Sequence, residues 1–146
     1  MTTAGSSSTQ NVLGLALRRY VDARSAALIE ARRALGVNEL DARAILYIAV
    51  NPGTRPTNLR NYLGITSAGV TALIDRLVDR GAVRRDVDDA DRRVNRITLI
   101  VDLDENPWNA LGAFDRAFDQ AVVDGGSDLS DFASCLDELT ATASVR

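Results

Sequence analysis

The spacing of apolar residues changes at Gly81, and this change limits the folds that the chain can adopt. The apolar residues before it fall on one face of a helix: Val70, Leu73, Ile74, Leu77 and Val78. After it, the segments AVRRDV (82–87) and NRITLIV (95–101) are rich in β-branched residues and alternate in part, and the polar stretch DDADRR lies between them. The sequence therefore predicts an amphipathic helix that leads directly into a β-hairpin with a long polar tip.

Three further helices are predicted before this one. Residues 11–35 have helical spacing, and Gly36 ends them. Either Asn38 or Asp41 caps a second helix, which the sequence NPG at 51–53 ends. A short third helix covers 57–63, with Leu59, Tyr62 and Leu63 expected to be buried. Either Thr66 or Ser67 then caps the fourth helix.

Two helices are predicted after the hairpin. The first begins at Asn106-Pro107 and ends at the glycine pair 125–126. The last is capped by Ser127 or Ser130. The predicted order is ααααββαα, which is a mainly α fold with a small β-hairpin wing, that is, a winged helix-turn-helix. We expect residues 1–10 to be a disordered tail and residues 38–101 to form the winged helix-turn-helix.

Composition excludes most catalytic sites. The chain has no histidine, no lysine and one cysteine, Cys135. A serine or cysteine nucleophile therefore has no histidine base, and a zinc site would have only carboxylates as additional ligands. No glycine-rich phosphate loop is present. We expect the protein not to be an enzyme and to need no cofactor or metal. Without a signal peptide or a long apolar run, we expect a cytoplasmic protein with no membrane partner.

The net charge of −3 is distributed unevenly. Residues 1–57 carry 7 arginines against 4 acids, and residues 58–101 carry 8 arginines against 6 acids. Residues 102–146 carry 2 arginines against 10 acids. Because a charged partner senses mainly the local field, the net negative charge does not exclude nucleic acid as the partner of the first two thirds. The alternative is that the asymmetry reflects solvated faces alone.

The outward face of the fourth helix fits a DNA groove. It carries small and polar residues: Ser67, Ala68, Gly69, Thr71, Ala72, Asp75 and Arg76. Small side chains allow close approach to a major groove, hydroxyls can bond phosphates or base edges, and Arg76 can reach a guanine or a phosphate. The alternative is that these small residues pack against a neighbouring helix.

The hairpin tip combines three acids with arginines. We hypothesise that Asp91 and one of Asp88 and Asp89 fix the wing internally, so that Arg92 or Arg93 projects into a narrow minor groove. The alternative is an ordinary solvated turn.

These features together resemble the MarR family of bacterial winged-helix regulators. The resemblance rests on TSAGVTALIDRLVDRGAV (66–83), DDADRR (88–93), RITLI (96–100) and the spacing of PTNLRNYLGI (56–65), and it covers about residues 11–143. It implies a homodimer built through residues 11–36 and 107–143, and a near-palindromic double-stranded DNA operator. It also implies a repressor that a small phenolic or lipophilic ligand releases from DNA. The resemblance places the DNA contacts of the helix at 67–69, 71, 72 and 76, and those of the wing at Arg92 and Arg93.

Some residues depart from the family pattern. Arg60 stands where the family usually has a small residue, and it is either a phosphate contact or a cause of altered helix packing. Cys135 lies in the last helix, where we expect it to be a buried core residue rather than a redox sensor. The acids of the last third are either solvated or paired with arginines of the first helix across the dimer.

Three aromatic residues are candidates for an effector pocket: Tyr20, Tyr47 and Trp108. Aromatic residues at helical spacing are more often core residues, which is the alternative. The overall alternative to a DNA-binding regulator is a winged-helix module for protein interaction or dimerisation that no longer binds DNA.

Overall fold

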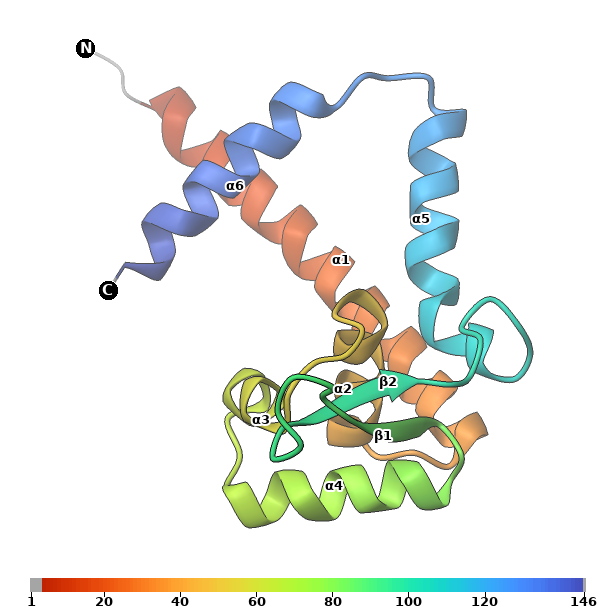
Figure 1. Ribbon diagram of the computed structural model, residues 1–146. Coiled ribbons are helices and arrows are strands. Elements are labelled where there is room, and N and C mark those ends of the chain that lie inside the picture. Colours follow the sequence, from red (N-terminus) through yellow and green to blue (C-terminus); the bar gives the residue numbers. More distant parts are fainter. Residues whose placement is uncertain (1–3, 146) are drawn as a thin grey trace. The chain divides into compact units, whose positions relative to one another are not determined.

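The computed structural model describes the backbone of residues 4–145 and the side chains of residues 12–145. The chain separates into a unit that ends at Phe114 and a second unit that begins at Asp115. The elements follow one another as α1 (Ala4–Leu35), α2 (Glu39–Val50), α3 (Pro56–Leu63), α4 (Ser67–Asp79), β1 (Val83–Val87), β2 (Asn95–Leu99), the short 3₁₀ helix η1 (Trp108–Gly112), α5 (Ala113–Asp124) and α6 (Ser130–Ser144) (Figure 1). This order confirms the predicted mainly α fold with a hairpin wing.

Helix α1 begins earlier than the sequence predicts. Its first residue is Ala4, so it extends into the segment 1–10 that the sequence predicts as a disordered tail. A helix that is already nucleated gains one hydrogen bond for each residue added, so it can continue into polar residues that would not start a helix alone. Residues 1–3 lie outside the described chain. At the other end the helix stops as predicted, at Gly36 with a φ of 65°.

The caps of the central helices resolve two open alternatives. The Asn38 side chain accepts a hydrogen bond from the Asp41 backbone N–H and caps α2. The Thr66 side chain accepts from the Gly69 N–H and caps α4. Each cap satisfies a backbone donor that has no partner within its own helix. Between the two helices, Gly64 ends α3 in the left-handed conformation with a φ of 67°, which only glycine adopts at little cost.

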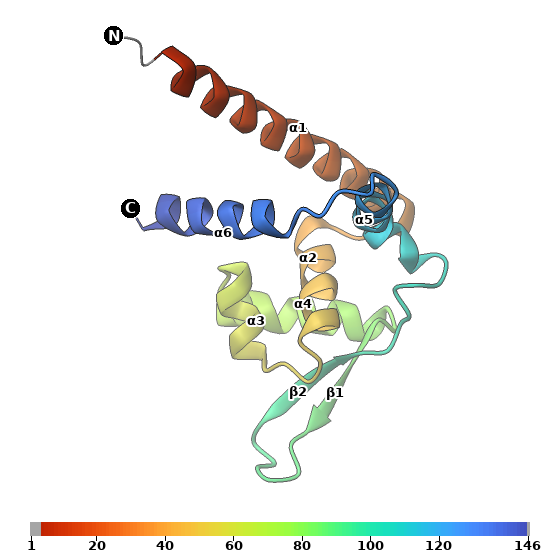
Figure 2. The ribbon, with the colours of Figure 1, turned by 90° about the horizontal axis from the view of Figure 1, so that it is seen from above.

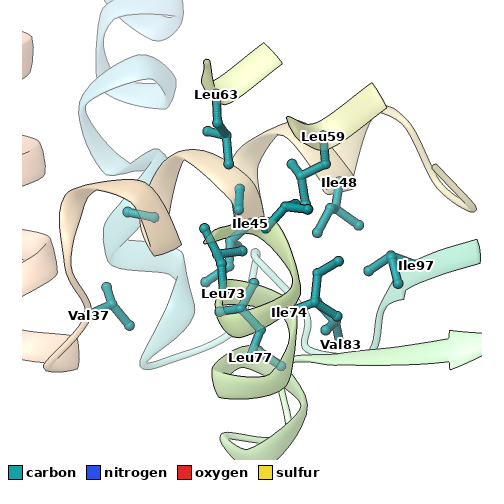
Figure 3. Close-up of a cluster of buried hydrophobic side chains, with 14 of the residues drawn as sticks. Val37, Ile45, Ile48, Leu59, Leu63, Leu73, Ile74, Leu77, Val83 and Ile97 are labelled. Carbon is teal, nitrogen blue, oxygen red and sulfur yellow. The ribbon is translucent and has the colours of Figure 1, made fainter. Parts of the chain in front are cut away.

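The hydrophobic core of the first unit joins α2, α3, α4 and the hairpin (Figure 3). Its largest fully buried side chains are Ile45, Ile48, Leu59, Leu73, Ile74, Leu77, Val83, Ile97 and Leu111. The predicted inward face of α4 is therefore confirmed. The prediction that Tyr62 is buried is wrong, because its side chain is 49% exposed and stacks on Tyr47 instead. A helix of eight residues is too short for its period to separate a half-covered position from a buried one.

The hairpin extends away from the helices that carry it (Figure 2). Its strands are antiparallel, with Val83 opposite Leu99 and Val87 opposite Asn95. On the outer side of β2, the Ile97 N–H donates to the Thr54 carbonyl over 2.8 Å. This bridge attaches the middle of β2 to the loop that follows α2, and so joins the wing to the helices.

The second unit consists of most of α5 and all of α6, and neither helix buries a residue. Cys135 is exposed, so the prediction that it is a core residue is wrong: in the single chain α6 provides no core for it. The predicted cap of α6 is also wrong, because the N-cap residue is Leu129, which makes no side-chain cap; the Ser130 N–H donates to the Asp128 side chain over 3.0 Å. Among the described residues, no helix combines the length and apolarity that a membrane span requires.

Candidate nucleic-acid interface

The outward face of α4 carries the predicted small and polar side chains. Ser67, Ala68, Thr71 and Ala72 are exposed, and Gly69 is half-buried. A Cβ atom at Gly69 would lie 3.1 Å from the Thr66 Oγ1 that caps the helix. A larger residue at this position would therefore push against the oxygen that caps the helix.

Arg60 bridges the turn between α3 and α4. One guanidinium nitrogen donates to Ser67 Oγ over 2.9 Å, and the other donates to Asn61 Oδ1 over 3.3 Å. The side chain is half-buried. The guanidinium therefore lies beside the first turn of α4, and both alternatives for this residue, a phosphate contact or altered helix packing, stay predictions.

Arg76 is held by Asp41. Its Nε and Nη2 atoms donate to the two carboxylate oxygens over 3.3 and 2.7 Å. The Asp41 side chain is only 6% exposed, whereas that of Arg76 is 48% exposed. These hydrogen bonds from the guanidinium raise the pKa of Arg76 above its ordinary value. The arginine predicted to reach DNA therefore fastens α4 to α2.

Two more arginines contact α4: Arg80 at its end and Arg85 at Asp75. Arg80 donates to the carbonyl oxygens of Leu35 and Gly36 over 2.9 and 2.6 Å, which ties the end of α4 to the end of α1. Arg85 of β1 donates to Asp75, the one acid on the exposed face of α4 named above. The carboxylate is thus paired, so it repels a phosphate less than a free carboxylate would.

Asp88 fastens the wing to its base. One carboxylate oxygen accepts from Arg96 Nε and Nη2 over 2.9 and 2.6 Å, and the other accepts from the Ala90 N–H over 2.9 Å. Arg96 also donates to the Gly53 carbonyl. The Ala90 amide first, and then the Arg96 guanidinium, lower the pKa of Asp88 below its ordinary value.

Asp91 orders the tip of the wing. Its carboxylate accepts from the Arg93 N–H over 3.0 Å, and its carbonyl accepts from the Val94 N–H over 3.0 Å. The side chains of Arg92 and Arg93 are exposed, and within the described chain they have no hydrogen-bonding or ion-pair partner. The hairpin thus engages Asp88 and Asp91 internally and leaves two arginines available.

Asp91→Ala is expected to weaken DNA binding about fivefold, although it removes a negative charge from the interface, because the turn that presents Arg93 loses its hydrogen bond. The matched control is Asp89→Ala, which removes the same charge from an exposed residue with no partner in the described chain. It is expected to leave affinity unchanged or raise it. Fluorescence anisotropy of a labelled duplex measures both, and equal effects would refute this role for Asp91.

Binding is expected to be nearly independent of pH between about 5.5 and 7.5, because the chain has no histidine to titrate there. The pKa of Asp88 is lowered on folding, so the stabilisation it provides is present above its unfolded pKa of about 3.9 and is lost only as the pH falls below that. Dissociation constants measured at constant ionic strength should change less than about twofold across this window. A tenfold change in the dissociation constant would mean that a group important for binding titrates in this window, which would contradict the prediction.

The three candidate pocket aromatics do not lie together. Tyr20 packs against Phe114 at a ring separation of 5.6 Å, and Trp108, the first residue of η1, packs against the core. Tyr47 stacks on Tyr62 at 4.3 Å. Only this second pair lines a cavity of about 700 Å³ between α1, α2 and α3. The other residues around it are Arg24, Ser25, Leu28, Ile29, Arg32, Glu39, Ala42, Arg43, Leu46, Val50 and Asn51.

No cluster of three or more acidic, cysteine or histidine side chains that could hold a metal ion occurs among the residues described.

Sequence reasoning missed the partners of the arginines. Asp41 is expected only as a helix cap, yet it holds Arg76 from 35 positions away. Arg96 lies close to the wing tip in the sequence. Its contacts with Asp88 and Gly53 form only because the register of the hairpin brings these residues beside it. Arginine and aspartate are too frequent in this chain for their pairing to be read from order alone.

Comparison with known proteins agrees with this geometry. Residues 35–94 match the model of the MarR family. No curated protein sequence matches the chain. A mutant of MepR from S. aureus bound to an oligodeoxyribonucleotide is similar in structure, with a TM-score of 0.60 and 15% identity over 92% of this chain and 98% of that one.

Two other solved structures share the fold. The transcriptional regulator Tm0710 from Thermotoga maritima has a TM-score of 0.61 and 22% identity over 92% of this chain and 94% of its own. A MarR-family regulator from Silicibacter pomeroyi has a TM-score of 0.62 and 22% identity over 89% and 87%. The match to the MarR family model thus covers the winged-helix region of this chain, and the chain shares its fold with these solved structures.

Proposed function

We propose that this chain is a DNA-binding transcription regulator that works as a homodimer, with α4 in a major groove and the wing in the adjacent minor groove. One observation carries the proposal: the hairpin pairs Asp88 and Asp91 within itself and leaves Arg92 and Arg93 exposed without partners among the described residues. Narrow minor grooves have a strong negative potential that attracts arginine. The small and polar exposed side chains on the outer face of α4 support the same function.

Exposed apolar side chains support the homodimer. Val12, Leu15 and Val21 of α1 are 65, 41 and 56% exposed. On α5 and α6, Phe118 and Phe132 are each 45% exposed. Apolar surface on this many helices favours association with a second copy. Because two-fold symmetry would repeat the DNA-binding unit, the operator should be a near-palindrome with half-sites about one helical turn apart.

We further propose that the protein is a repressor released by a small phenolic or lipophilic ligand. The cavity between α1, α2 and α3 supports this, because it combines the stacked Tyr47 and Tyr62 with several arginines. A phenolic ring could pack on the tyrosines while its oxygen accepts a hydrogen bond from an arginine of the lining.

Two experiments test these proposals. In the first, the protein selects duplexes from a random DNA pool, and its mass in solution is measured in parallel. Enrichment of a near-palindrome by a protein of dimer mass is expected, whereas failure to enrich any sequence would favour the alternative of a protein-interaction module. In the second, phenolic compounds are screened for their effect on Tm, and the selected duplex is checked for release. A screen without any shift would count against a ligand-responsive repressor.

A further inference from the structure

The two exposed hydroxyls of α4 have different hydrogen-bonding capacities, and each is set by a contact within the protein. Thr71 Oγ1 lies 3.0 Å from the carbonyl oxygen of Ser67. A carbonyl carries no proton, so the threonine hydroxyl must donate this bond. Its lone pairs remain available, and its side chain is exposed. As long as this bond is kept, Thr71 can only accept a hydrogen bond from a partner outside the protein.

Ser67 has the opposite capacity. Arg60 places a guanidinium nitrogen 2.9 Å from Ser67 Oγ. A guanidinium can only donate, so the serine oxygen accepts and keeps its proton for an outside partner. The positive charge beside it disfavours the approach of a further amine. Arg60 and Ser67 together thus form a donor site, suited to a phosphate or to the N7 and O6 atoms of guanine.

The two sites lie in sequence along the face of α4. Thr71 follows Ser67 by four residues, which is about 6 Å along a helix axis. The exposed residues between and beside them, Ala68 and Ala72, carry no side chain longer than a methyl group. Asp75, the nearest acid on this face, is engaged by Arg85. The short side chains beside Thr71 therefore leave its hydroxyl exposed on this face.

We propose that Thr71 determines sequence specificity by accepting a hydrogen bond from an exocyclic amine, so that the base facing it is adenine or cytosine. In the major groove these two bases present an amine, at N6 and N4, whereas guanine and thymine present acceptors at O6 and O4. An acceptor-only hydroxyl binds the first pair and is repelled by the second. This inference rests on the proposed function, since it requires that α4 enters a major groove.

The test compares base preference in matched variants. Thr71→Val keeps the shape and the branched carbon but lacks the oxygen, and Thr71→Ser keeps the oxygen but lacks the methyl group. Each variant and the wild type select duplexes from the same random pool. We expect wild type and Thr71→Ser to require adenine or cytosine at one position of each half-site, and Thr71→Val to accept all four bases there. The slope of affinity against salt should be the same for all three, because no charge changes.

Removal of the amine itself completes the test. The selected duplex is prepared with purine in place of adenine, or with 2-pyrimidinone in place of cytosine, at that position. Wild type should lose about fivefold in affinity, and Thr71→Val should lose nothing further. Equal losses in both proteins, or a guanine or thymine at the position that responds to Thr71→Val, would overturn the inference while leaving the proposed function intact. Failure of the wild type to select any sequence would overturn both.

Discussion

Arg76→Leu is expected to lower the free energy of unfolding by about 2–3 kcal/mol, because it leaves the Asp41 carboxylate buried without its partner. Loss of one member of a fully buried ion pair costs about 3–5 kcal/mol. The effect here should be smaller, because the arginine side chain is 48% exposed and water can enter the space it vacates. Urea unfolding at a fixed protein concentration measures the change.

Arg85→Leu is the matched control for this prediction. It also removes an arginine that pairs with an aspartate and contacts α4, but both members of that pair are exposed, at 37 and 54%. Exposed pairs contribute at most about 1 kcal/mol. Adding Asp41→Asn to Arg76→Leu should recover part of the lost stability, because a neutral amide is less costly to bury than a carboxylate. Equal losses for Arg76→Leu and Arg85→Leu, with no recovery, would show that the Asp41 pair does not fasten α4.

The paired replacement Arg92→Ala and Arg93→Ala is expected to weaken binding of the selected duplex by at least about a hundredfold, with stability unchanged. Each groove contact by an arginine contributes roughly 1–3 kcal/mol, and a dimer loses four such side chains. The slope of log affinity against log salt should become shallower by up to about 3.6, since each neutralised phosphate adds about 0.9. Anisotropy titrations at several salt concentrations measure both quantities.

Arg18→Ala with Arg19→Ala provides the control for the wing. It removes the same charge from two adjacent arginines that are exposed on α1, outside the winged helix. Provided that both double variants keep the mass of the wild type, the α1 variant should change affinity much less than the wing variant. If the two lose affinity equally, net charge and not the wing determines binding.

The sequence predicts those parts of the fold that depend on neighbours in the chain. Val70, Leu73, Ile74 and Leu77 lie on one helical face, so their burial follows from the period of the helix alone. The wing is predicted because the spacing of apolar residues changes from helical to alternating after Gly81. The turn at the wing tip is predicted because an aspartate such as Asp91 can accept a hydrogen bond from a backbone N–H two residues later. These features need no information about distant contacts.

The features that the sequence does not predict depend on packing between distant segments. Arg76 has the position of a DNA-contacting residue on α4, but Asp41 reaches it only once α2 and α4 have packed together. Arg80 likewise binds the end of α1, 44 and 45 positions away. The predicted burial of Cys135 fails for a related reason: whether α6 has a buried face depends on what covers it, and the single chain does not cover it.

The central proposal, that this winged helix reads DNA, is tested most directly by comparing two duplexes in anisotropy titrations at about 50 and 200 mM salt. One is the selected duplex and the other has the same bases in shuffled order. We expect the selected duplex to bind about a thousandfold more tightly, and both affinities to fall steeply as salt rises. Equal affinity for both duplexes, or no binding at low salt after unfolding and refolding the protein to remove any ligand, would contradict the proposal.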